Sequence, residues 1–275
     1  KGIVFKEVLG LLSAEADKIV ESRVLGDAVP DTSALRFGVS PHAPYTTSLC
    51  LYRSALKAAR ENGWPTVTHL AESPEEARFI NGGDGPLAEM HEALGSPTVD
   101  FESANSSPVR YLSDGGALAG IDLAVHCNQT DEADWALLAE AGVCVCLCPR
   151  SAVHLGHPFA DAAGMRLAGL NLCLGTDSRA SSPSLSVLEE AAALWEADPE
   201  LSPEVLLEMC TVAGAEVLGF RQEGVGRIVP GGVADFAVVE PPPGKDEPEL
   251  ADIFHPAARV RTTVSDGVIR FERGD

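Results

Sequence analysis

The stretch Thr66-Val67-Thr68-His69-Leu70-Ala71-Glu72-Ser73 alternates apolar and polar residues and contains a histidine followed, three positions later, by a glutamate. Successive side chains of a β-strand point to opposite faces, so the alternation predicts a strand that carries His69. Pro74 cannot donate to a strand ladder and suits the first turn of a helix, which residues 75–80 are expected to form. Glu72 is therefore expected on the turn between them. An ordinary core histidine is the alternative interpretation of His69.

The composition describes a globular, acidic chain. Its 275 residues are 45% hydrophobic, which is enough to build a sizeable core. With 41 acidic and 20 basic residues, the formal charge of −21 repels phosphate backbones and anionic lipids, so we expect neither a nucleic-acid nor a membrane partner. Seven cysteines without the spacing of a disulfide scaffold favour a reducing compartment, the cytoplasm.

Strand-like and helix-like segments alternate along most of the chain. The predicted strands are 2–9, 35–45, 66–70, 123–128, 143–149 and 170–177. The predicted helices between them are 11–20, 48–62, 75–80, 132–141 and 159–168. Six such units in succession predict a parallel sheet, in which the loops after the strands gather on one face.

Two further regions depart from this alternation. Residues 81–108 are rich in Gly, Ser, Pro and Asn around one short predicted helix, 87–94, and are expected to shape the mouth of a pocket. After residue 183 the pattern predicts two helices and then a small β region. These segments are helices 184–197 and 203–218, strands 226–229 and 235–239, and a hairpin 260–272 that turns at Asp266-Gly267.

Three of the predicted strands end in side chains that can bind a metal or move a proton: His69, His126 and Asp177. Imidazole nitrogens and carboxylate oxygens are ligands of catalytic zinc or iron, which needs a few protein ligands and one open position. Each residue has an ordinary alternative, a core histidine for His126 and a helix N-cap for Asp177. The occurrence of all three at strand ends favours a metal site.

Five motifs, in this order along the chain, resemble those of the amidohydrolase superfamily. They are Ser40-Pro41-His42-Ala43-Pro44-Tyr45, His69-Leu70-Ala71-Glu72, Val125-His126-Cys127, Leu174-Gly175-Thr176-Asp177-Ser178 and residues 226–236. The resemblance is strongest to aminohydrolases that deaminate purine-like rings, namely adenosylhomocysteine and methylthioadenosine deaminases, aminodeoxyfutalosine deaminase and guanine deaminase, and to the related triazine hydrolases. The match extends over the whole chain.

The resemblance implies an α/β fold, a (β/α)8 TIM barrel whose third to eighth strands are present here, with a small β-sandwich built from both chain ends. We expect residues 1–220 to belong to the barrel and residues 221–275 to the sandwich. The family's first strand carries a His-x-His metal-binding pair, and this sequence contains no His-x-His. We therefore expect that pair and two strands upstream of Lys1. A degenerate, inactive relative is the alternative.

The resemblance also implies roles for individual residues. His69 would bind one divalent metal ion, zinc or alternatively iron. Asp177 would be a second ligand or a close neighbour and would accept a proton from the reacting water. His126 would contact that water and the substrate, with metal ligation as a weaker expectation. Glu72 would carry a proton to the substrate.

Two residues are expected to contact the substrate. His42 lies between two prolines and resembles a substrate-binding histidine at the end of the family's fourth strand. Arg150 follows the predicted strand 143–149 and could grip a substrate carboxylate with two hydrogen bonds. A structural ion pair is the alternative for Arg150, because the chain has an excess of acidic residues.

These expectations combine into a metal-dependent hydrolase that releases ammonia from a small heterocyclic substrate. The candidate substrates are aminodeoxyfutalosine, adenosylhomocysteine or methylthioadenosine, and guanine-like bases. Hydrolysis of another C–N or C–Cl bond, as in a triazine or a cyclic amide, is the alternative within the enzymes. A non-catalytic relative with a decayed metal site is the alternative outside them. The oligomeric state is left open, with a homodimer as one option.

Overall fold

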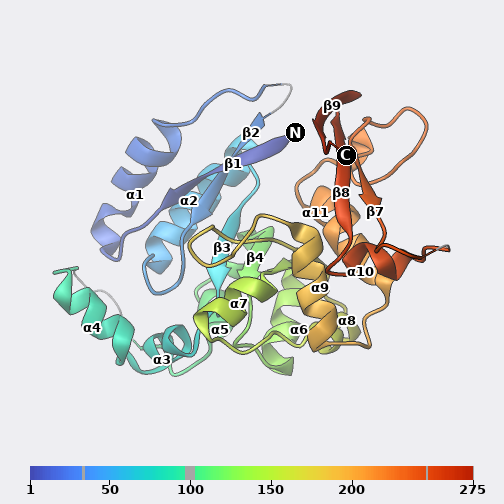
Figure 1. Ribbon diagram of the computed structural model, residues 1–275. Coiled ribbons are helices and arrows are strands. Elements are labelled where there is room, and N and C mark those ends of the chain that lie inside the picture. Colours follow the sequence, from blue (N-terminus) through green and yellow to red (C-terminus); the bar gives the residue numbers. More distant parts are fainter. Residues whose placement is uncertain (33–34, 97–102, 246, 275) are drawn as a thin grey trace. The chain divides into compact units, whose positions relative to one another are not determined.

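The computed structural model describes residues 1–32, 35–96, 103–245 and 247–274, which are coloured by sequence in Figure 1. The chain forms two compact units. The first comprises Lys1–Cys146 and Gly156–Asn171, and the second comprises Leu147–Leu155 and Leu172–Asp275. Among the described residues, no helix is both long enough and apolar enough to cross a bilayer.

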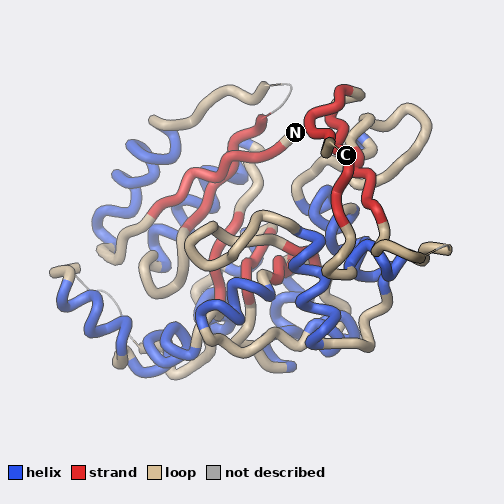
Figure 2. The backbone as a smooth tube through the Cα atoms, in the orientation of Figure 1, coloured by secondary structure: helices blue, strands red, loops and turns tan. Residues whose placement is uncertain are grey.

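Five parallel strands organise the first unit, and they follow one another in space as they do in the sequence (Figure 2). They are β1 (Gly2–Val8), β2 (Leu35–Pro41), β3 (Val67–Leu70), β4 (Leu123–His126) and β5 (Cys144–Leu147). The pairs β1–β2, β3–β4 and β4–β5 are parallel, and a parallel bridge between Val39 and Thr66 connects β2 to the start of β3. The predicted parallel arrangement of consecutive strands is thus confirmed.

The helices of the first unit lie between these strands. They are η1 (Ser13–Glu15), α1 (Ala16–Ile19), η2 (Val20–Leu25), α2 (Leu49–Asn62), α3 (Pro74–Gly82), α4 (Pro86–Ala93), α5 (Pro108–Asp114), η3 (Leu118–Gly120), α6 (Glu132–Ala141) and α8 (Ala162–Leu167). The limits of α2 have a local cause, since the Ser48 hydroxyl caps its first turn and Gly63, at φ 67°, ends it in the left-handed conformation.

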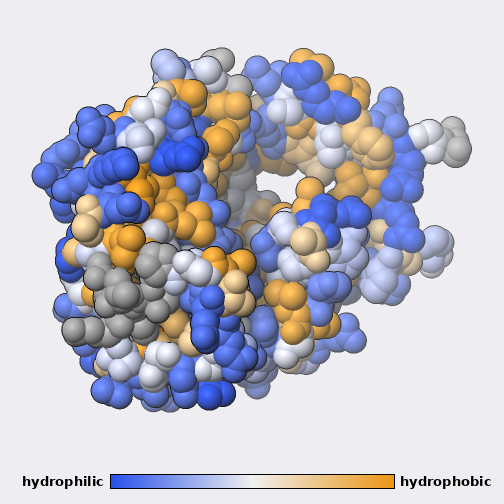
Figure 3. All heavy atoms as spheres, turned by 90° about the vertical axis from the view of Figure 1, so that its left-hand side faces the viewer, coloured by the Kyte–Doolittle hydropathy of each residue, from blue (hydrophilic) through white to orange (hydrophobic). Residues whose placement is uncertain are grey.

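The core beside the first two strands is aliphatic. Val8, Val39 and Leu51 are at most 2% exposed and pack in one cluster with η2 and α2. Each such side chain contributes roughly 1.5–3 kcal/mol through burial. On the outer face of this region, hydrophilic side chains alternate with hydrophobic ones (Figure 3). Hydrophilic side chains are thus exposed on this face, while apolar contacts hold the strands together.

Several predicted elements of the first unit are shorter or different. The helix expected at 11–20 is a 3₁₀ turn, one α-helical turn and a π-helix that reaches Leu25. The strand expected at 35–45 ends at Pro41. In the irregular region 81–108, the predicted short helix is present as α4, while residues 97–102 lie outside the described part of the chain. Helix α5, which begins at the end of this region, was not predicted.

The second unit contains mostly helices and one antiparallel sheet. Its elements are α7 (Pro149–Leu155), β6 (Leu172–Leu174), α9 (Val187–Ala197), α10 (Pro203–Cys210), α11 (Val212–Val217), η4 (Arg221–Glu223), β7 (Phe236–Glu240), η5 (Leu250–Phe254), β8 (Arg259–Ser265) and β9 (Val268–Glu272). The Gly175 N–H donates to the Leu147 carbonyl, so the chain just after β6 is bonded to the chain just before α7.

The predicted C-terminal hairpin is confirmed, with β8 and β9 joined at Asp266-Gly267 and β7 paired to β8. Two other predictions for this unit are wrong. The helix expected at 203–218 breaks at Thr211, which has φ −132° and ψ −82°. The strand expected at 226–229 does not form, because glycines with positive φ at 224 and 226 turn the chain there.

Candidate metal and active site

The ends of β3 and β4 bring His69, Glu72 and His126 together. Nδ1 of His69 lies 3.1 Å from Nε2 of His126, and the two rings stack with centroids 5.2 Å apart. Oε1 of Glu72 lies 3.7 Å from the same Nε2 atom. One potential ligand atom from each residue lies within 4.8 Å of the other two. Imidazole nitrogens are ligands of catalytic zinc, so His69 and His126 fit the predicted metal, and the Glu72 carboxylate lies beside them where it can exchange a proton.

The backbone at these strand ends adopts left-handed conformations that are uncommon for residues other than glycine. Ala71 has φ 49°, His126 has φ 78° and Cys127 has φ 51°. Such conformations are strained, and they tend to occur where surrounding contacts hold a functional side chain. The contacts here are backbone hydrogen bonds across the two loops, from Cys127 N–H to the Leu70 carbonyl and from Gln129 N–H to the Ala71 carbonyl.

Glu76 is a residue of this region that the sequence analysis missed. Its side chain is completely buried, and its carboxylate accepts the N–H groups of Ala71 at 3.0 Å and of Glu72 at 2.8 Å. Burial raises the pKa of Glu76 to about 8, against the lowering effect of these two hydrogen bonds. The motif Ser73-x-x-Glu76, typical of a capped helix start, was the available signal.

His42 lies next to the same cluster. Its ring centroid is 5.2 Å from that of His69, and its carbonyl accepts the His69 N–H at 2.8 Å. Its Nδ1 atom is 2.6 Å from the Thr46 hydroxyl, which fixes the ring orientation. Burial lowers the pKa of His42, His69 lowers it further, and Glu7 opposes both. Glu7, His42 and His69 form a second group whose ligand atoms lie within 4.8 Å of one another.

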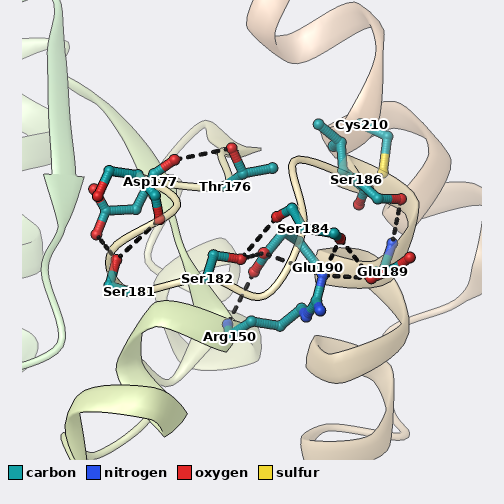
Figure 4. A network of polar contacts seen from close by, with 12 residues as sticks. Arg150, Thr176, Asp177, Ser181, Ser182, Ser184, Ser186, Glu189, Glu190 and Cys210 are labelled. Carbon is teal, nitrogen blue, oxygen red and sulfur yellow. Dashed lines mark hydrogen bonds and ion pairs between the residues drawn. The ribbon is translucent and has the colours of Figure 1, made fainter.

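Asp177 belongs to the second unit, where serine hydroxyls hold its carboxylate (Figure 4). Oδ2 of Asp177 accepts hydrogen bonds from Ser151 at 2.7 Å and from Ser181 at 2.5 Å. Asp177 has φ 55° and lies three residues beyond the end of β6. It is not a helix N-cap, because Ser186 caps the next helix, α9. The carboxylate is thus oriented by contacts from two segments of this unit.

Arg150 lies at the start of α7 and contacts acidic residues of α9 (Figure 4). Its Nη1 atom is 2.6 Å from Oε2 of Glu189 and 2.8 Å from the Ser184 hydroxyl. Its backbone N–H donates to the buried carboxylate of Glu190 at 2.9 Å. Burial raises the pKa of Glu190, and the contacts with Arg150 oppose that shift. These contacts are those of the structural ion pair, and a substrate contact by Arg150 stays a prediction.

Comparison with known proteins places this arrangement in a family. A model described as "Amidohydrolase family" matches residues 10–270. The chain belongs to the amidohydrolase family. Amidohydrolases are metal-dependent, in agreement with the donor set at the strand ends. The (β/α) barrel predicted from the sequence is confirmed as the fold class.

Named relatives of this amidohydrolase include two curated proteins. This chain is 36% identical over 198 residues to an aminodeoxyfutalosine deaminase of Deinococcus radiodurans, and the match covers 68% of this chain and 46% of that protein. It is 31% identical over 229 residues to a 5-methylthioadenosine/S-adenosylhomocysteine deaminase of Nitratidesulfovibrio vulgaris, covering 81% and 46% respectively. The chain thus spans about half the length of the curated relatives it matches.

A solved structure supports the fold assignment. An adenosine deaminase from Xanthomonas campestris with bound zinc has a TM-score of 0.74 to this amidohydrolase, at 23% identity, with 98% of this chain and 60% of that chain covered. At this level of identity the likeness concerns the fold alone.

Proposed function

We propose that this amidohydrolase is a metal-dependent hydrolytic deaminase that releases ammonia from an amino-substituted purine or purine nucleoside. The observation that carries the proposal is the cluster of His69, Glu72 and His126, in which two potential metal ligands lie beside a carboxylate that can carry a proton. The names of the relatives support the same choice, since those proteins are named as deaminases of aminodeoxyfutalosine and of methylthioadenosine and adenosylhomocysteine.

The residues proposed to hold one divalent metal ion are His69, Asp177 and, more weakly, His126. Zinc is the preferred ion and iron is the alternative, because both accept imidazole and carboxylate ligands. When bound, the metal supplies a Lewis acid that lowers the pKa of a coordinated water to ~7.

The chemical steps are assigned to three side chains. Asp177 accepts a proton from the water whose oxygen forms the new bond to the ring carbon. Glu72 donates a proton to the adjacent ring nitrogen. The proton held by Asp177 then passes to the exocyclic nitrogen, so that the C–N bond breaks and ammonia leaves. Glu72 recovers its proton from the hydroxyl newly bound to the ring carbon, which becomes the oxo group. His126, which is 2% exposed, orients the reacting water from within the protein. Each such proton transfer contributes about 10²- to 10⁴-fold in rate.

Further parts of the proposal concern substrate contacts and domain organisation. His42 would contact the substrate ring beside His69. For Arg150, a contact with a substrate carboxylate is the alternative to its ion pair with Glu189. Residues 1–220 are proposed as barrel and 221–275 as part of a second, β-rich domain. None of the seven cysteines, all of which are described, forms a disulfide, which supports the proposed cytoplasmic location.

The function can be tested by measuring ammonia release. The full-length protein is loaded with zinc or iron and offered aminodeoxyfutalosine, adenosylhomocysteine, methylthioadenosine, adenosine and guanine. Release of ammonia in proportion to the hydroxylated or oxo product supports the proposal. Folded, metal-loaded protein that is inactive on the whole panel contradicts it.

The same family fold supports hydrolysis of other bonds, and product analysis separates the possibilities. A triazine hydrolase would release chloride, and a cyclic amidase would yield a ring-opened acid. A non-catalytic relative would bind no metal. Metal content, measured by mass spectrometry of the purified protein, therefore separates the enzyme hypotheses from the binding or scaffolding one.

A further inference from the structure

We propose that Glu76 and Asn128 form a clamp that fixes the backbone of Glu72 and thereby aims its carboxylate at the reacting atoms. The inference rests on the proposed function of Glu72 as proton carrier and adds two positioning residues to it. The name clamp refers below to these two side chains and the hydrogen bonds that they make to the 71–72 backbone.

The clamp holds Glu72 from both sides of its backbone. One oxygen of the Glu76 carboxylate accepts the Glu72 N–H at 2.8 Å, while the other accepts the N–H of Ala71 at 3.0 Å. On the opposite side, the side-chain amide of Asn128 donates to the Glu72 carbonyl at 3.0 Å. Side chains therefore bind both the N–H and the carbonyl of Glu72. These hydrogen bonds restrict the backbone conformation of the turn that carries the Glu72 carboxylate.

The clamp connects the two strand ends that form the cluster. Glu76 belongs to the first turn of α3, whereas Asn128 lies two residues beyond His126 on the loop after β4. The carboxylate of Glu72 is 3.7 Å from His126. A contact from the His126 loop to the Glu72 backbone therefore sets the distance between the two side chains that the mechanism requires to act together.

Helix capping alone does not account for Glu76. In an ordinary capping box, the glutamate at the third helical position returns to the N–H of the N-cap residue, which here is Ser73. The Glu76 carboxylate instead reaches past Ser73 to the N–H groups of Ala71 and Glu72. Ser73 still caps the helix, since its hydroxyl accepts the Glu76 N–H at 3.1 Å. The reach of Glu76 beyond the cap is what points to a positioning role.

The burial of the Glu76 side chain also costs folding free energy. Its side chain is 0% exposed, and no ion pair to it occurs within the described ranges of the chain. A buried acidic group without a cationic partner is retained only where its hydrogen bonds compensate. The turn that it holds contains Ala71 in the left-handed conformation, which needs such support.

A double-mutant cycle tests the clamp. Glu76→Gln keeps one acceptor oxygen and loses the other, so we expect kcat to fall by about 10- to 100-fold with KM and metal content unchanged. In a Glu72→Gln background the same change should lower the residual kcat by less than about twofold, because the clamp acts through Glu72. Glu75→Gln, the same substitution one residue earlier, is the matched control and should leave kcat unchanged.

Asn128→Ala tests the clamp from the other side and keeps the test valid if Glu76→Gln does not fold. Asn128→Ala should lower kcat in the protein that retains Glu72 and should leave the residual kcat of the Glu72→Gln protein nearly unchanged. Equal losses of kcat with and without Glu72, or a wild-type kcat in both clamp variants, would overturn the clamp while leaving the deaminase intact. A wild-type protein without any turnover would instead overturn the deaminase and the clamp with it.

Discussion

Nδ1 of His69 lies 3.1 Å from Nε2 of His126, with the two imidazole rings stacked at an angle of 23°. The strand register alone does not produce this contact, because Leu70 of β3 is paired with His126 of β4 and His69 is paired with Val125. His126 leaves the extended conformation at φ 78°, and its ring stacks on that of His69. Two ring nitrogens this close share a proton or a metal ion. The relationship makes the two residues one unit of the proposed site, although their proposed roles differ.

Substitution of the two histidines should separate these roles. His69→Asn should reduce the metal content of the purified protein to a small fraction, because His69 is the residue of the pair that we propose as a metal ligand. His126→Asn should retain most of the metal and lower kcat by about 10²- to 10⁴-fold. Metal analysis and steady-state kinetics on the same samples check this. Full metal occupancy in His69→Asn would remove that residue from the ligand set.

The free energy of unfolding should depend on pH because of the protonation of Glu76. Its folded pKa of about 8 lies above the ordinary value of 4.5, so the folded state binds the proton more tightly than the unfolded state. Stability from this group is complete below about pH 4.5 and is lost as the pH rises through about 8. The unfolding free energy of wild type and of Glu76→Gln is measured by chemical denaturation from pH 4.5 to 8.5. It should change less with pH in the variant than in wild type. Parallel profiles would contradict the assignment.

The serines that hold Asp177 should influence metal affinity. Ser151→Ala removes one of the two hydroxyl donors to Oδ2, and we expect about 10- to 100-fold weaker metal binding with the fold retained. Ser178→Ala is the control, because Ser178 lies next to Asp177 and its hydroxyl accepts the Ala180 N–H. Competition with a metal chelator measures both affinities. Equal affinities in the two variants would mean that Ser151 does not orient the ligand.

Arg150→Met distinguishes the two interpretations of Arg150. Its contacts with Glu189 and Ser184 lead us to expect a loss of roughly 1–3 kcal/mol in unfolding free energy, which a melting curve would register. KM should change by the same factor for adenosylhomocysteine, which carries a carboxylate, and for methylthioadenosine, which does not. A selective rise in KM for the carboxylated substrate would establish the substrate contact instead.

Much of the fold was predictable because local patterns and the tertiary structure agree. The limits of α6 match the prediction, 132–141, since Asp131 caps its start and Gly142 ends it at φ 72°. The contact between His69 and His126 was predictable as well, because consecutive parallel strands end on one face. The metal-ligand roles of His69, His126 and Asp177 stay predictions.

The errors have local causes that the hydrophobic pattern does not reveal. The helix at 203–218 breaks because the Thr211 hydroxyl donates to the Leu207 carbonyl and competes with the helical hydrogen bonding. Residues 226–229 look like a strand, yet Ile228 is 89% exposed and Gly226 has φ 81°. Glu76 was missed because its importance depends on reaching back to Ala71 and Glu72, which periodicity does not encode.

The most direct test of the central claim compares wild type with Glu72→Gln. Both proteins are purified with metal, their metal content is determined, and ammonia release is measured on the best substrate of the aminopurine panel. We predict equal metal content and a kcat about 10²- to 10⁴-fold lower in the variant, because the glutamine amide cannot carry the proton. Metal-loaded Glu72→Gln that releases ammonia at the wild-type rate would contradict the account.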